Sequence, residues 1–517
     1  MELQQAPRDR RQGERAGLLA NFLMMAGSGY FELFAGLIRS VLVMRLLGPT
    51  GNGLVGVVRL AQQYLSNSHL GALHGITKHL PRALGAGDHA RAEQIEDVGA
   101  TWVLLTSSMG AAGILLVSLW ASHLGLPTRQ VLALGSVVFL CGQVYTLYRT
   151  VARAWQVFRP LLLASVAYSV SLTVLMIGGA WAGWATGAVA GWLGASVLAI
   201  VVLHYTMRLR IRLSLAWPVV RSLIAAGIPL AAMAFADTLL VALDGTLLVR
   251  RGATTFGLYA GIAMQTRRYL FNLARSLTFV LMPHVLEEFA HHKDLVRLRG
   301  TALRAATAAA CTVPALSLLT ALLLPPAAQT LVPKFVTAVP AGQIVAFGTA
   351  LMILPLAFST VLVALDAEWP SVAAQLAGAA VIAVAAWQPA GRGDMVGVAL
   401  ASAMGSWVVA MAVGWLALSL TGLRTLQTLR TLAGLQLPLA GAVVTFWLAN
   451  FAGDELQMHA YTWSGGLLRL AVAAALAAPG LAWAEHRYRL VRRSLQALVQ
   501  MSRGGAGAVE DDADAQD

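Results

Sequence analysis

Residues 160–205 read PLLLASVAYSVSLTVLMIGGAWAGWATGAVAGWLGASVLAIVVLHY and contain no aspartate, glutamate, lysine or arginine. A helix of about 20 apolar residues crosses the hydrocarbon core of a bilayer. The stretch is about twice that length and is interrupted by a short break near 181–184. We therefore predict two membrane-spanning helices, 160–181 and 184–205, joined by a short connection.

Similar apolar runs fill most of the chain, which is 58% hydrophobic and 12% charged. A soluble globular protein has about 25% charged residues, so the composition excludes that class. We predict an all-α integral membrane protein with about fourteen transmembrane helices, counted as apolar runs of sufficient length. The other predicted spans are 17–47, 52–73, 97–122, 129–149, 219–248, 254–283, 301–325, 338–364, 370–388, 395–420, 433–451 and 464–484.

The formal net charge of +13 would suit a nucleic-acid-binding protein, but the positions of the basic residues argue against that class. With the predicted spans, 25 basic residues fall in the connections on one side of the membrane and 5 in those on the other. Basic residues concentrate in cytoplasmic connections. We therefore predict a multi-pass protein of the bacterial cytoplasmic (inner) membrane, with both termini cytoplasmic and no nucleic-acid partner. The connections 74–96 and 284–300 are predicted to be amphipathic helices on the membrane surface.

The first six spans and the next six align at an offset of about 205 residues, which predicts an internal repeat. Duplicated lobes of this kind are typical of transporters that alternate access to a central site. The aligned pairs include Glu32 with Asp237, Arg39 with Asp244, and Gly53 with Gly257. The predicted divisions are a cytoplasmic N-terminal segment (1–16), an N-lobe of six helices (17–212), a C-lobe of six helices (213–425), two extra transmembrane helices (426–486), and a cytoplasmic tail (487–517) whose end is disordered.

Charged residues inside the predicted spans gather in four of them: 17–47, 52–73, 219–248 and 254–283. A charge at mid-membrane costs about 2.5–3.5 kcal/mol on insertion, so such residues usually face a polar cavity or one another. Helical periodicity places several of them on common faces, which predicts a hydrated cavity. The candidate substrate-binding residues are Arg39, Arg59, Arg267, Arg268, Arg275, Gln63 and Asn272, and the candidate acidic residues are Glu32, Asp237 and Asp244.

Two interpretations of these charges remain open. The acidic residues either pair with the arginines as structural ion pairs or carry a coupling proton or sodium ion. Five arginines exceed three acidic residues, so at least two cations need another partner, such as an anionic ligand, water or lipid phosphate. Arginine binds phosphate oxygens in a bidentate manner, which favours an anionic cargo.

Residue patterns typical of catalysis or metal binding do not occur in the sequence. There is no His-Glu-x-x-His pair and no glycine-rich loop ending in Gly-Lys-Ser/Thr, and Cys141 and Cys311 each lie in an apolar run. We therefore predict a transporter rather than an enzyme, with no metal and no cofactor. The predicted energy source is a proton or sodium gradient.

Four short motifs resemble one known family. They are RLLGPTGNG (45–53), RTVARAWQVF (149–158), GIPL (227–230) and GLY (257–259). They are similar to the oligosaccharide flippases and polysaccharide-export proteins of the multidrug/oligosaccharidyl-lipid/polysaccharide (MOP) superfamily. The resemblance covers residues 17–300, and the two extra C-terminal helices also resemble the lipid II flippase branch.

This resemblance implies a two-lobed flippase that works by alternating access. Its substrate would be a glycan linked to undecaprenyl pyrophosphate or a similar polyprenyl carrier: O-antigen, exopolysaccharide or peptidoglycan precursor. Arg59, Arg268 and Arg275 would hold the pyrophosphate, and membrane lipids and glycan-assembly proteins would be partners. A cation-coupled exporter of small drugs or metabolites is the alternative. A membrane-bound glycan polymerase would need a large outer loop, which the predicted topology lacks.

Overall fold

The computed structural model describes residues 6–120, 125–207, 212–279, 294–456 and 459–488, and the side chains within 29–272 and 294–477 of these ranges. The described residues form helices joined by short turns, so the predicted all-α class is confirmed. The elements are α1 (Ala6–Leu65), α2 (Ala72–Gly85), α3 (His89–Trp120), α4 (Leu126–Ala154), α5 (Phe158–Met207), α6 (Trp217–Val249), α7 (Ala253–Tyr259), η1 (Ala260–Met264), α8 (Gln265–Phe279), α10 (Leu295–Leu331), η2 (Pro333–Ala338), α11 (Val339–Ala364), α12 (Glu368–Arg392), α13 (Met395–Leu420), α14 (Thr425–Glu455) and α15 (Trp463–Tyr488).

Helices α1 and α5 each contain two helices that are separated by a glycine kink. In α1, Gly48 has φ 63° and ψ −175°, in the left-handed region that glycine adopts without steric cost. In α5, the break falls at Gly183 and Trp184. The two halves of α5 pack against each other, because a Cβ on Gly179 would lie 2.1 Å from the carbonyl oxygen of Gly187. The predicted division of the opening stretch into two spans is therefore confirmed.

Nine helices within the described ranges are long and apolar enough to cross a membrane. They are α3 to α6, α10, η2 together with α11, and α12 to α14. The remaining predicted spans coincide with α1, with α7, η1 and α8 together, and with α15, apart from span ends that lie outside the described residues. One predicted end is wrong: the span 52–73 stops at Leu65, where α1 ends, and residues 66–71 form turns. The helices therefore follow the predicted order of spans along the whole described chain.

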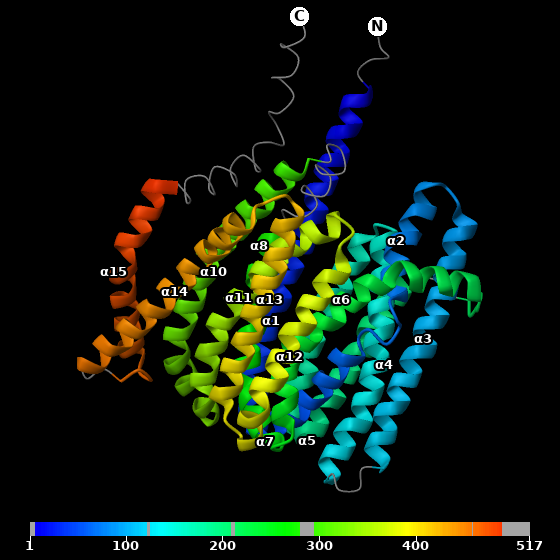
Figure 1. Ribbon diagram of the computed structural model, residues 1–517. Coiled ribbons are helices and arrows are strands. Elements are labelled where there is room, and N and C mark those ends of the chain that lie inside the picture. Colours follow the sequence, from blue (N-terminus) through cyan, green and yellow to red (C-terminus); the bar gives the residue numbers. More distant parts are fainter. Residues whose placement is uncertain (1–5, 121–124, 208–211, 280–293, 457–458, 489–517) are drawn as a thin grey trace, which may run out of the picture.

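The helices form two packed groups with α14 and α15 at one flank (Figure 1). The first group contains α1, α3, α4 and α5, and the second contains α6 and α10 to α13. Between the groups, α1 packs against α7, and α2 packs against α6. Helix α14 packs against α10, and α15 packs against both of them. The exact residues at which the predicted lobes begin and end stay predictions.

A reciprocal glycine contact joins the two repeats at one end of the bundle, near α7 in Figure 1. A Cβ on Gly53 would lie 1.9 Å from the carbonyl oxygen of Ala253, and a Cβ on Gly257 would lie 1.8 Å from that of Pro49. Each glycine therefore allows the backbone of the other repeat to approach. Position 53 corresponds to 257 and position 49 to 253, so the same contact is made twice with the partners exchanged.

Hydrogen bonds strengthen this reciprocal glycine contact. The hydroxyl groups of Thr50 and Thr254, which occupy corresponding positions in the two repeats, lie 2.8 Å apart. The Asn52 side chain donates to the carbonyl oxygen of Gly257 over 2.9 Å. The alignment of the repeats in sequence thus corresponds to a physical pairing in the fold.

The predicted surface helix at 74–96 is divided between two elements. Helix α2 is amphipathic: Ile76 and Leu80 are buried against the bundle, whereas Lys78 and Arg82 are exposed. The chain turns after α2, and residues 89–96 already form the start of α3. Most of the second predicted surface helix, 284–300, lies outside the described residues, and its last part belongs to α10.

Arg469 connects the two extra C-terminal helices. Its guanidinium group donates to Asn450 over 2.7 Å and to the Asp454 carboxylate over 2.5 Å. The arginine side chain is buried, so its charge is balanced by groups on the neighbouring helix. The contact fixes α15 against α14.

Candidate functional site

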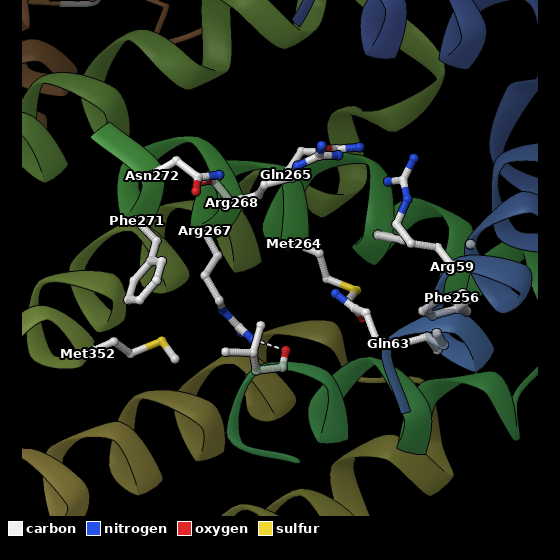
Figure 2. Close-up of a pocket in the computed structure, with 14 residues that line it drawn as sticks. Arg59, Gln63, Phe256, Met264, Gln265, Arg267, Arg268, Phe271, Asn272 and Met352 are labelled. Atoms are coloured by element: carbon white, nitrogen blue, oxygen red, sulfur yellow. Dashed lines mark hydrogen bonds between the residues drawn. The ribbon is translucent and has the colours of Figure 1, made fainter. Parts of the chain in front are cut away.

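Two adjoining cavities lie at the centre of the bundle. The larger cavity has a volume of about 230 Å³ and is lined by α1, α6, α7, η1, α8 and α11 (Figure 2). The smaller cavity has a volume of about 150 Å³ and is lined by α1, α5 and α8. Arg59 and Arg268 line both cavities. The two repeats therefore contribute jointly to one central region.

The predicted site residues gather at these cavities. Residues of the larger cavity include Arg59, Gln63, Gln265, Arg267, Arg268 and Asn272, and residues of the smaller cavity include Glu32, Arg39, Arg59 and Arg268. The kink at Gly48 explains how Arg39 and Arg59 meet. In a straight helix the two residues would lie about 30 Å apart, at about 1.5 Å per residue. Sequence spacing alone predicted that these residues share a cavity, but it did not predict the kink that brings the two halves of α1 together there.

Arg59 and Arg268 approach the cavities from different helices, α1 and α8. No hydrogen bond or ion pair engages either guanidinium group within the part of the chain that the structure describes. The charges of Arg39, Arg59 and Arg268 lie near enough to repel one another. Arg59 is half-buried and Arg268 is exposed to the cavity, so both remain available to a ligand.

Arg39 and Glu32 both line the smaller cavity, as their seven-residue spacing predicted. Arg39 is attracted by the charge of Glu32 and donates to the Thr173 hydroxyl over a long 3.4 Å. One carboxylate therefore faces three arginines in this cavity. The balance of charge at the smaller cavity remains positive.

Arg267 lies on the same helix as Arg268 but points away from it, and Figure 2 shows the two side chains diverging. Its guanidinium group forms an ion pair with Asp244, which is fully buried. The group also donates to the Val241 carbonyl over 2.5 Å and to the Ser402 hydroxyl over 3.0 Å. Neighbouring residues in a helix lie about 100° apart, which explains the different surroundings.

Asp244 is saturated by donors from the protein itself. Its Oδ2 atom accepts from the Tyr259 hydroxyl over 2.7 Å as well as from Arg267. Its Oδ1 atom accepts from the Gly245 amide over 2.7 Å. The acidic residues were expected either to form structural ion pairs with arginines or to carry a coupling ion. Asp244 forms a structural ion pair with Arg267. A role of Arg267 in binding substrate stays a prediction, although the residue borders the larger cavity.

Three further candidates lie in different surroundings. Asp237 is exposed, although it shares a helix face with the buried Asp244. Asn272 lines the larger cavity and donates to the Arg268 carbonyl over 2.8 Å. The side chain of Arg275 lies outside the described residues. Its predicted contact with substrate stays a prediction.

Several residues of the site were missed because nothing local in the sequence identifies them. Tyr259 and Ser402 complete the partners of the ion pair from distant parts of the chain. Tyr168 and Trp192 line the smaller cavity, where the indole donates to the Tyr168 hydroxyl over 3.1 Å. Tyr259 is the last residue of the GLY motif (257–259), and this motif was the only feature of the sequence that could have identified it as a site residue.

This arrangement suits binding of an anion rather than catalysis. Within the described residues no group of three or more histidine, cysteine, aspartate or glutamate side chains could hold a metal ion. The larger cavity combines the arginines with apolar side chains such as Phe256, Phe271 and Met352. A ligand with an anionic group and an apolar part would match both features. The cavities thus form a candidate anion-binding site between the two repeats.

Several solved structures that share this fold are described as transporters or as a flippase. The lipid II flippase MurJ in an inward closed conformation has a TM-score of 0.66 at 11% identity, covering 90% of this chain and 99% of that chain. A multidrug resistance MATE family transporter of the MOP superfamily, inward-facing, has a TM-score of 0.56 at 14% identity and 80% and 95% coverage. A MOP superfamily transporter from Pyrococcus furiosus, whose binding pocket is described as having reverse polarity, has a TM-score of 0.53 at 15% identity. The match covers 80% of this chain and 95% of that chain.

The family profile described as "Polysaccharide biosynthesis protein" matches residues 42–332, which is more than half of the chain. The chain therefore belongs to this family and has the fold of the MOP superfamily transporters. A comparison with curated protein sequences gives no match. The family match and the shared fold confirm the resemblance predicted from the four motifs.

Proposed function

We propose that the protein is a flippase for a polyprenyl-pyrophosphate-linked oligosaccharide, which it moves from the inner to the outer leaflet of the bacterial inner membrane. The family description and the fold shared with a lipid II flippase support this choice. The observation that carries it is the pair Arg59 and Arg268, which face both central cavities from different helices. Within the described ranges no ion pair to an acidic side chain engages either guanidinium group, which favours a diphosphate as the ligand.

The orientation belongs to the same proposal. The 25 basic residues on one predicted side against 5 on the other support cytoplasmic termini and cytoplasmic loading of the substrate. Glu32 and the exposed Asp237 remain candidates for a coupling proton or sodium ion. Asp244 is a weaker candidate, because Arg267, Tyr259 and a backbone amide already occupy its oxygens. Contacts with glycan-assembly proteins rest on the resemblance alone.

The alternative is a cation-coupled exporter of small drugs or metabolites. The apolar part of the larger cavity, with Phe256, Met264 and Phe271, would suit such cargo. The arginines favour the glycolipid, because a cationic drug would be repelled by them. A flippase of this kind binds a polyprenyl diphosphate, whereas the exporter binds a cationic drug, so a binding assay with the diphosphate distinguishes the two functions.

We expect the Arg59→Gln and Arg268→Gln variants to bind undecaprenyl pyrophosphate more weakly than the wild-type protein. A hydrogen bond to a charged group contributes about 1.5–3 kcal/mol. Loss of one such contact therefore weakens binding about 10- to 100-fold. Native mass spectrometry of the purified protein with undecaprenyl pyrophosphate measures the affinity. Translocation is measured in liposomes as quenching of a fluorescent undecaprenyl-pyrophosphate disaccharide by an impermeant reductant.

The matched control is Arg392→Gln, an exposed arginine at the end of α12 and outside both cavities. Its binding and translocation are expected to equal those of the wild-type protein. Unchanged binding in both cavity variants would remove the proposed site. Drug-dependent transport by a wild-type protein that does not bind the diphosphate would instead favour the exporter.

A further inference from the structure

The last turns of α4 carry a group of charged and aromatic side chains outside both cavities. Tyr145, Arg149 and Arg153 follow one another at four-residue intervals, which places them along one face of the helix. The guanidinium carbon of Arg149 lies 5.4 Å from the centre of the Tyr145 ring. Neither arginine lines the cavities that contain Arg59 and Arg268. The two arginines therefore form a separate cationic pair at the end of α4.

The positive charges of this pair are not balanced by direct contacts. Among the residues whose side chains the structure describes, neither guanidinium group forms an ion pair or a hydrogen bond. The Nε atom of Arg149 is buried in this state. A buried donor without a partner is costly, and like charges four residues apart on a helix repel each other. An anion bound between Arg149 and Arg153 would remove both costs.

The carboxylate of Glu32 on α1 acts on the pair from a distance. Its charge attracts Arg153 and also Arg39, whereas Arg149 repels Arg153. Glu32 lines the smaller cavity, so it lies within electrostatic reach of both that cavity and the end of α4. One carboxylate cannot neutralise three guanidinium groups. The end of α4 therefore keeps a positive balance of charge.

The end of the helix accounts for only one of the two arginines. A basic side chain in the last turn of a helix is stabilised by the partial negative charge of the last carbonyls. Arg153 occupies this position in α4, which ends at Ala154. Arg149 lies one turn further in, and its Nε atom is shielded from water. Cytoplasmic arginines that only orient the chain in the membrane need no such burial. The position of Arg149 therefore indicates a ligand.

This end of α4 lies on the predicted cytoplasmic side of the bundle and close to the smaller cavity. Leu147 and Val151 of α4 pack with Ile76 of α2, and Figure 1 shows α2 and α7 toward opposite ends of the molecule. The ring centres of Tyr145 and Tyr168 lie 5.1 Å apart, and Tyr168 lines the smaller cavity. The cationic pair therefore lies beside the cavity on the side from which the cargo would enter.

We propose that Arg149 and Arg153 are a loading site for the diphosphate of the cargo, an assignment that rests on the proposed function. Guanidinium groups bind phosphate oxygens through paired N–H donors. Residues four apart lie about 6 Å apart along a helix axis, so both side chains can reach one diphosphate. The diphosphate binds here first and then passes to Arg39, Arg59 and Arg268 in the cavities. The pair thus adds a second anion site outside the central one.

Native mass spectrometry of the full-length protein with undecaprenyl diphosphate tests the loading site, because it counts the ligands on each molecule. We expect two binding steps in the wild-type protein. The second needs a higher ligand concentration, because Arg153 is exposed and water screens its charge. Arg149→Gln/Arg153→Gln should weaken the second step at least about tenfold and leave the first unchanged. Arg59→Gln/Arg268→Gln should weaken the first step and retain the other.

Two further variants separate the loading site from overall charge and from misfolding. Arg424→Gln/Arg430→Gln removes two exposed arginines at the start of α14, on the same predicted side, and should keep both binding steps. Arg149→Lys/Arg153→Lys keeps the charges but loses the planar fork of donors. Its second step should fall between those of the wild-type protein and the glutamine variant. A lysine variant that binds in this way is folded.

The loading site is overturned if the wild-type protein binds a single diphosphate, or if Arg149→Gln/Arg153→Gln keeps the second step. It is also overturned if the control at α14 loses that step to the same extent, since overall charge would then cause binding. Displacement of the second ligand by an equal concentration of phosphatidylglycerol would show a phospholipid headgroup site instead. A first step that Arg59→Gln/Arg268→Gln leaves unchanged would contradict the proposed central site and not the loading site.

Discussion

Arg267→Gln is expected to destabilise the protein by about 3–5 kcal/mol, because the substitution leaves Asp244 as an uncompensated buried charge. Asp244 is 0% exposed and the Arg267 side chain 4% exposed, so water cannot replace the lost partner. Tyr259 and the Gly245 amide would remain as donors but carry no positive charge. The free energy of unfolding in mixed detergent, followed by tryptophan fluorescence, measures the change.

The double variant Asp244→Asn/Arg267→Gln serves as the control for this ion pair. Removal of both charges should cost less than the sum of the two single variants, because neither charge is left alone. Equal stability of Arg267→Gln and wild-type protein would show that Asp244 does not depend on its arginine. A variant that is stable but fails to translocate would point to a direct role of Arg267 in substrate binding.

Gly257→Ala and Gly53→Ala are each expected to cost about 3 kcal/mol or more, at the upper end of the range for overpacking. The added Cβ would lie within 2 Å of a backbone oxygen in the other repeat, where no side chain can move aside. The helices would have to separate and lose the Thr50–Thr254 and Asn52 hydrogen bonds. The same unfolding measurement detects the loss.

A matched glycine shows whether the reciprocal glycine contact causes this effect. Gly113 lies within α3, and a Cβ there would meet nothing within 4 Å. Gly113→Ala should be neutral or stabilising by up to about 1 kcal/mol, because alanine is the better helix former. If Gly257→Ala behaves in the same way as Gly113→Ala, the two repeats do not rely on close backbone approach.

The sequence predicted the helices and the central cluster of arginines because both depend on short-range patterns. Apolar runs determine the spans, and residues seven apart share a helix face, as Glu32 and Arg39 do. The same rule also grouped Asp237 with Asp244, which differ in burial. Two helical turns separate them by about 10 Å along the axis, enough to place one in the core and the other at its edge.

The distinction between Arg267 and Arg268 could not be predicted from one sequence. The two residues are adjacent, and only the position of α6 and α13 determines that one meets Asp244 and Ser402 while the other meets the cavities. The π-helical segment η1, which precedes both, changes the register of α8 relative to a regular helix. Long-range partners of this kind have no counterpart in local spacing.

The origin of the cavity arginines in two different repeats has a mechanical consequence. Arg39 and Arg59 belong to α1, whereas Arg268 belongs to α8, and their charges repel. In the absence of a bound anion, this electrostatic repulsion favours separation of the two repeats at the level of the cavities. An anion bound between the arginines replaces repulsion with attraction. The cargo would thereby supply the force that draws the two repeats together around it.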